Sequence, residues 1–188
     1  AMALAAAGSL LYLPLKNAGL TNLASSHILL GLGMLTIGFI LLLEGNFLFV
    51  VLAVEAAALR YVSFTTGNTK ISGSSHLLFG VVFLWLVNGM SAKLGAATLL
   101  VDIDSLTYLG IILLGGAIVP QWLRVSGFKQ VYYLSSHLLF LFWMYQNLSA
   151  LHNGQAWISV AWGIYAIGII VLGFLRHSKG ARLVGMGT

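Results

Sequence analysis

Three copies of one short motif carry most of the side chains in this sequence that could do chemistry. Each copy is Ser-Ser-His followed by apolar residues, at positions 25–27, 74–76 and 135–137. Each is followed by a turn and a second apolar stretch that ends near an arginine. Imidazole and guanidinium groups can bind phosphate or anionic lipid headgroups, or they can snorkel and cap helix ends. The candidate side chains for a lipid or anion site are His27, His76, His137, Arg60, Arg124 and Arg176.

Glu55 is the one acidic residue deep inside an apolar stretch. It lies eight residues from Phe47 and nine from Phe64, which places it roughly 12–13 Å from either end at about 1.5 Å per residue. An ionised carboxylate at that depth costs at least about 2.5–3.5 kcal/mol. Glu55 must therefore be protonated, paired or next to a polar cavity. It serves either as a structural hydrogen bond between helices or as a contact for a proton or substrate. The candidate partners on other stretches are Asn88, Gln121, Tyr145, Gln146 and Asn147.

The composition identifies the medium in which these side chains lie. Of the 188 residues, 60% are apolar and 7% are charged, against roughly 25% charged in soluble domains. The mean hydropathy is +0.99. These values exclude a water-soluble enzyme and indicate an integral membrane protein. Cysteine is absent, so disulfides and thiolate metal sites are excluded. The sequence has no phosphate-binding glycine loop, nucleophile elbow or paired-His metalloprotease motif, so we expect no catalytic residue and no metal site.

Seven apolar stretches, the first of them short, are candidate spans of a bilayer core of about 30 Å. We predict an all-α, polytopic helical bundle of about seven transmembrane helices, built from three parallel repeated helical hairpins at 24–64, 74–124 and 131–176. Serines of the repeated motif are expected to cap helix starts. The whole of 1–188 forms one transmembrane domain, and we expect it to be a fragment of a longer protein. The stretches are 2–15, 24–43, 47–64, 74–90, 105–123, 131–151 and 156–175.

The basic residues predict an orientation. If the links between stretches alternate across the membrane, eight of the nine Lys and Arg residues lie on one side and Lys93 lies on the other. An excess of Lys and Arg marks the cytoplasmic side. The N-terminus is then outside and the C-terminus is cytoplasmic. The side with Lys93 also holds Glu44, Asp102 and Asp104; the two aspartates are expected to cap the next helix.

Two segments resemble a bacterial family of many-pass membrane proteins known only as a domain of unknown function. One is Glu44-Gly45-Asn46-Phe47 followed by an alanine-rich phrase around Glu55, within 41–61. The other is the last helix, 156–182, with Gly173, a basic cluster and Arg182-Leu183-Val184-Gly185. The resemblance implies tandem helical hairpins in a bacterial cytoplasmic (inner) membrane. It implies no known reaction.

These observations leave three functions open. The first is a non-enzymatic structural or accessory module of a larger envelope protein or membrane complex. The second is a transporter or lipid-handling protein, with Glu55 and the cytoplasmic His/Arg ring along the path. The third is a membrane subunit that binds haem or chlorophyll through His27, His76 or His137; otherwise no cofactor is expected. The expected partners are the lipid bilayer and other membrane subunits or further helices of the same chain, with no nucleic acid.

The absence of native cysteine makes the orientation directly testable. We predict that Gly127→Cys lies on the cytoplasmic side and that Asn46→Cys lies outside. A membrane-impermeant thiol reagent added to intact cells should label only the cysteine at position 46. Both should react after the cells are permeabilised. Equal labelling of the two positions in intact cells would contradict the predicted topology.

Overall fold

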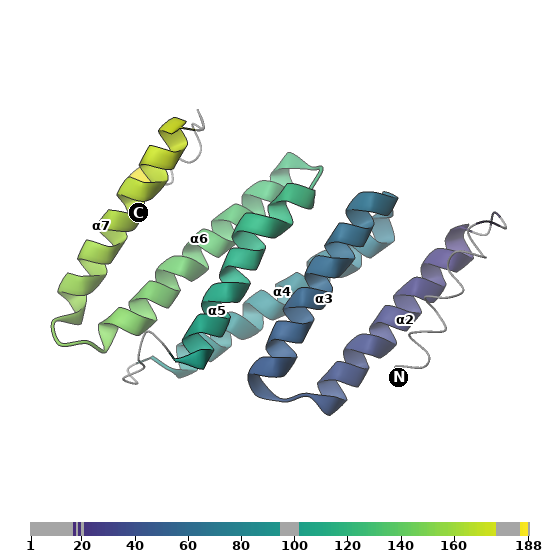
Figure 1. Cartoon of the computed structure of the whole chain (residues 1–188), viewed down its shortest axis with the longest axis horizontal. Helices are drawn as coiled ribbons and strands as arrows, with labels where there is room; N and C mark the ends of the chain where they lie inside the picture. Colours follow the sequence, from purple (N-terminus) through teal and green to yellow (C-terminus); the bar gives the residue numbers. More distant parts are fainter. Residues whose placement is uncertain (1–16, 18, 20, 95–101, 176–184, 188) are drawn as a thin grey trace. The chain divides into compact units, whose positions relative to one another are not determined.

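The computed structural model of the chain describes residues 17, 19, 21–94, 102–175 and 185–187, and these residues form helices and connecting turns without a strand (Figure 1). The long helices are joined by short links, so that successive helices form hairpins. The elements in chain order are α2 (Thr21–Leu42), α3 (Gly45–Thr66), α4 (Thr69–Ala92), α5 (Ile103–Leu113), the π-helical turn η1 (Leu114–Ile118), the 3-10 turn η2 (Val119–Trp122), α6 (Ser126–Ser149) and α7 (Gly154–Leu175).

Four helical segments are long and apolar enough to cross a membrane: Gly45–Thr66, Thr69–Ala92, Ile103–Trp122 and Gly154–Leu175. This confirms the predicted all-helical class and makes membrane spans plausible. α2 contributes a shorter apolar segment, Ser26–Leu42. The predicted stretch 2–15 lies outside the described residues. The other six predicted stretches fall largely on helical residues, because long apolar runs favour helices in lipid; Pro120 in the stretch 105–123 lies in the 3-10 turn η2.

The described residues divide into two compact units. The first combines the chain up to Leu86 with Gly110–Ser136, and the second combines Val87–Leu109 with the chain from His137 onward. Large apolar side chains fill the interior of the first unit, where they pack between the helices. The most deeply buried of these are Leu52, Ile71, Phe79, Val82, Leu86 and Val119.

A tight turn joins α3 to α4. Gly67 ends α3 in the left-handed conformation (φ 71°), and its N–H donates to the Ser63 carbonyl over 2.9 Å. Glycine takes this conformation without the penalty that a Cβ atom brings. The Asn68 side chain then accepts from the N–H groups of Lys70 (3.0 Å) and Ile71 (3.4 Å). Asn68 therefore caps the start of α4.

The serines of the repeated motif do not cap helix starts, so that prediction is wrong for the copies at 74–76 and 135–137. α4 begins earlier, after Asn68, and α6 begins at Ser126. The serines lie inside the helices, where they face neighbouring backbone. Ser75 is buried and donates to the Ala56 carbonyl of α3 over 2.9 Å. Ser136 is also buried and packs against the backbone of η1. The second serine is thus a contact between helices.

Gly116 in η1 is a point of close approach between helices. A Cβ atom at this position would lie 2.8 Å from the Cβ atom of Ser136 on α6, which is closer than carbon atoms pack. We predict that Gly116→Ala lowers the free energy of unfolding by about 1–3 kcal/mol, the usual range for overpacking. Thermal unfolding in detergent measures this.

Gly163→Ala is the matched control, since a Cβ atom at Gly163 in α7 meets nothing within 4 Å. We expect this substitution to be neutral or slightly stabilising, because alanine favours helix more than glycine does. Equal melting temperatures for the two variants would show that the η1–α6 approach is not tight.

Candidate functional site: Glu55 and the groove between α2 and α3

Glu55 lies in the middle of α3 and is buried, with 7% of its surface exposed. The residues of α3 around Glu55 are predominantly apolar, and the alanines at 53, 56 and 57 have small side chains. Its hydrogen-bond partner is Thr36 of the adjacent helix α2: the Thr36 hydroxyl donates to Glu55 Oε1 over 2.7 Å. The other carboxyl oxygen, Oε2, is buried without a hydrogen-bond partner among the described residues. One side of the carboxyl is therefore satisfied and the other is not.

The geometry at Thr36 favours a neutral carboxyl group. The Thr36 hydroxyl also lies 3.0 Å from the carbonyl of Leu32, one turn earlier in α2. A threonine hydroxyl has a single proton to donate. If Glu55 is ionised, this proton must serve both acceptors. If Glu55 is protonated, it can donate to Thr36 while Thr36 donates to Leu32, and both contacts are then complete hydrogen bonds.

Glu55 lines an open apolar groove between α2 and α3, which we call the Glu55 groove. Its volume is about 440 Å³, which falls within the range of roughly 300–1,000 Å³ that is typical of small-molecule sites. Apart from Glu55, the groove is lined by aliphatic side chains and one phenylalanine. They include Leu32, Leu35, Phe39, Val51, Val54 and Ala58.

None of the five partners predicted for Glu55 binds it, so that prediction is wrong. Gln121 donates to the Ala117 carbonyl of its own helix. Asn147 bonds to Ser105 and Trp143 in the second unit. The partner is instead Thr36, whose stretch of sequence precedes Glu55 directly. Threonine is compatible with an apolar helix because its hydroxyl can bond to the backbone carbonyl one turn earlier. The sequence therefore gave no sign that Thr36 binds Glu55.

Arg60 is the centre of a second polar cluster in the first unit. Its Nε and Nη2 atoms donate to the Trp122 carbonyl at the end of η2, over 3.2 and 2.7 Å. Its Nη1 donates to the Ser72 hydroxyl of α4 over 2.5 Å. Ser72 lies 3.4 Å from His76 Nε2, and His76 Nδ1 lies 3.0 Å from the Tyr132 hydroxyl on α6. Arg60 and His76 are thus joined through Ser72.

Arg60 of α3 contacts the end of η2, and Arg124, which follows η2, contacts the end of α3. Arg124 Nη2 donates to the Phe64 carbonyl near the end of α3 over 2.9 Å, and its guanidinium lies 5.6 Å from the Phe64 ring centre. Cations are favourable beside the carbonyl groups that end a helix. Each of these two arginines therefore caps the end of the other's segment.

The remaining candidates have separate environments. His137 lies 3.0 Å from the Tyr165 hydroxyl and is stacked on that ring, within the second unit. His27 is half-buried on α2, and Arg176 lies outside the described residues. The described contacts therefore bring Arg60 and His76 together and give His137 its own partner. In the described part of the chain, no group of three or more His, Cys, Asp or Glu side chains could hold a metal ion.

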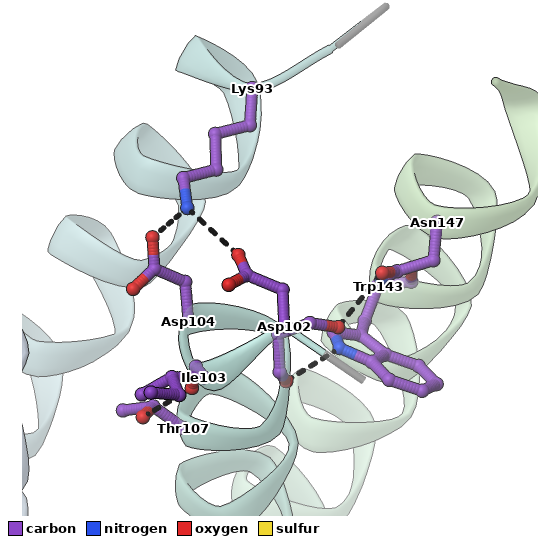
Figure 2. A network of polar contacts seen from close by, with 8 residues as sticks. Lys93, Asp102, Ile103, Asp104, Thr107, Trp143 and Asn147 are labelled. Carbon is purple, nitrogen blue, oxygen red and sulfur yellow. Dashed lines mark hydrogen bonds and ion pairs between the residues drawn. The ribbon is translucent and has the colours of Figure 1, made fainter. Parts of the chain in front are cut away.

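A polar network in the second unit gives the acidic residues at 102 and 104 a structural role (Figure 2). The Lys93 ammonium lies between both carboxylates, 3.6 Å from Asp102 and in direct contact with Asp104. The Ser105 hydroxyl donates to the Asn147 side chain over 2.8 Å, and Trp143 Nε1 donates to the Ser105 carbonyl over 2.9 Å. Asp104 is in the first turn of α5, where an anion is favoured.

Comparison with protein-family models, with curated proteins and with solved structures finds no match. The site is therefore interpreted from its own geometry.

The bidentate contact of Arg60 with the Trp122 carbonyl predicts that lysine cannot replace it. Lysine lacks the planar fork of donors that reaches both the carbonyl and Ser72. We expect Arg60→Lys to lower the free energy of unfolding by about 1–3 kcal/mol, the usual effect of losing hydrogen bonds to a charged group. Lys70→Arg, at an exposed position on α4, is the control and should leave unfolding unchanged. If both variants unfold like the native protein, Arg60 does not hold these segments together.

Proposed function

We propose that this protein is a non-enzymatic, multi-pass membrane module that binds an apolar, membrane-resident ligand in the Glu55 groove. The observation that carries the proposal is that Glu55 lines an otherwise apolar groove while one of its carboxyl oxygens is buried without a partner among the described residues. A buried polar atom without a partner destabilises a fold by about 1–3 kcal/mol. A ligand with a complementary polar group would remove that penalty and would bury its apolar part against α2 and α3.

The groove suits a ligand that arrives from the bilayer. Two of its lining residues, Val50 and Val54, are 41% and 56% exposed, so the groove is open at the apolar surface of the hairpin. An apolar molecule dissolved in lipid could enter there without crossing a polar barrier. This geometry supports a lipid-handling or transport role over an enzymatic one, since no nucleophile or general base lines the groove other than the single carboxyl.

The histidines and arginines support stability rather than catalysis in this proposal. Arg60, His76, Arg124 and His137 each contact a hydroxyl or carbonyl of the same chain. The proposed setting is a bacterial cytoplasmic membrane with the C-terminus inside, in agreement with the distribution of basic residues. The three helical hairpins would then be copies of one unit, since Ser75 and Ser136 are both buried against the preceding segment, Ser75 by a hydrogen bond and Ser136 by close packing on Gly116.

A second candidate function is an accessory module within a larger membrane complex. It is favoured by α7, of which only 6% is buried although it is the most apolar of the candidate spans. Its exposed side chains could pack against other membrane subunits or against lipid. The two functions are compatible, because α7 and the Glu55 groove are different surfaces of the chain.

Filling the groove tests the proposal. We predict that Ala58→Trp abolishes binding of triphenylphosphine oxide, a neutral probe whose three phenyl rings can contact the apolar walls of the groove. Equilibrium dialysis of the protein in detergent micelles, corrected for partition into empty micelles, measures the affinity. We expect a loss of about tenfold or more, corresponding to at least about 1.4 kcal/mol.

Val160→Trp on α7 is the matched control, since it adds the same side chain at a position that is 54% exposed and is not among the residues that line the groove. It should bind the probe as the native protein does. Absence of probe binding by the native protein, or equal binding by both tryptophan variants, would contradict the proposed function.

A further inference from the structure

We infer that the Glu55 groove selects a hydrophobic cation, and that this cation and a proton compete for the same carboxyl group. The inference rests on the proposed function and names the chemical class of its ligand. It follows from two features of the groove: a single ionisable group, and walls that provide nothing else for a charged ligand to contact.

The first step concerns charge. A protonated Glu55 leaves the groove neutral, and so does an ionised Glu55 paired with one cation. The ionised, empty groove carries an uncompensated charge among apolar side chains, which is strongly unfavourable. The two favourable states therefore differ by an exchange: the cation enters as the proton leaves, in a ratio of one to one. An anionic headgroup would find no donor among the aliphatic lining residues.

The second step concerns the neighbouring charges. α2, α4 and the η2 turn pack against α3, and several titratable groups lie on these elements or just beside them. None of these groups lines the described groove. Arg60 is directed to Trp122 and Ser72, His76 to Tyr132, and Arg124 to Phe64. No second charge within the groove is thus available to compensate Glu55. Besides Glu55, the groups are His27, Glu44, Arg60, Tyr61, Lys70, His76, Arg124 and Tyr132.

The third step concerns the unpartnered oxygen. Thr36 engages Oε1, and Oε2 is buried with no hydrogen-bond partner among the described residues, on a side chain that lines the groove. A quaternary ammonium or phosphonium cation does not depend on a hydrogen bond to the carboxylate. It needs only the negative charge of the carboxylate within an apolar enclosure. Its apolar substituents can contact the side chains of α2, such as Leu35 and Phe39, and those of α3, such as Val51. The groove therefore matches the charge and the surface of a hydrophobic cation.

The test compares two probes of similar shape, the cation tetraphenylphosphonium and the neutral triphenylphosphine oxide. Equilibrium dialysis of the full chain in detergent gives the affinity for each across mildly acidic to mildly alkaline pH. While the free carboxyl is protonated, we expect the affinity for the cation to rise by about tenfold per pH unit, since one proton is displaced. The affinity for the neutral probe should not rise with pH. In weakly buffered solution, a pH indicator should detect one proton released per cation bound.

Glu55→Gln is the matched variant, because it keeps the size of the side chain and removes its charge. It should lose the cation and its pH dependence while still binding triphenylphosphine oxide. Glu55→Asp should keep the pH dependence with weaker binding. The native pH profile needs no variant and so remains informative if a variant fails to fold.

The outcomes separate the inference from the proposed function. If the native protein binds both probes with no pH dependence, or if Glu55→Gln still binds the cation as tightly, the inference is overturned. The proposed function then stands as long as Ala58→Trp still blocks binding. If neither probe binds the native protein, both the function and the inference fail.

Discussion

The guanidinium group of Arg60 joins three segments that are far apart in the sequence. From α3 it reaches the carbonyl at the end of η2 and the Ser72 hydroxyl of α4. A carbonyl at the end of a helix has no partner within that helix and needs a donor from elsewhere. Arg60 is such a donor, and its own charge is in turn stabilised by the carbonyl. The position of α3, and with it the position of Glu55, depends on this contact.

The same constraint explains the composition of the rest of the first unit. Arg124 contacts the end of α3, Asn68 caps the start of α4, and Ser75 bonds to the backbone of α3. Each of these polar side chains is matched to a backbone group. Glu55 departs from this pattern: one of its oxygens has no partner among the described residues. The Ser136 hydroxyl is also buried without a partner in the described part of the chain, but of these two groups only Glu55 is ionisable and lines the groove.

The long apolar stretches and the small number of charged residues predicted an all-helical fold, because a long apolar run in lipid has few alternatives to a helix. Glu55 was predictable as a special position for the same reason. The residues that bind Glu55 were not predictable from the sequence. Thr36 resembles many other small polar residues, and its hydroxyl gains importance only because α2 and α3 pack side by side. The serine motif was predicted to cap helices because serine often does so, but Asn68 sits at the actual start of α4. Which polar residue takes a cap depends on where the turn falls, and the turn depends on Gly67.

The uneven burial of the helices has a consequence for how the chain enters a membrane. α7 has the highest mean hydropathy of the four candidate spans, 2.3, and the smallest buried share, 6%. α3 carries Glu55 at its centre, where an ionised residue costs about 2.5–3.5 kcal/mol to insert, and Arg60 nearer its C-terminal end. Thr36 on α2 and the end of η2 supply their contacts, and η2 is synthesised later than α3. The contact between Arg60 and the Trp122 carbonyl can therefore form only after the chain has been synthesised as far as residue 122, later than α3 itself.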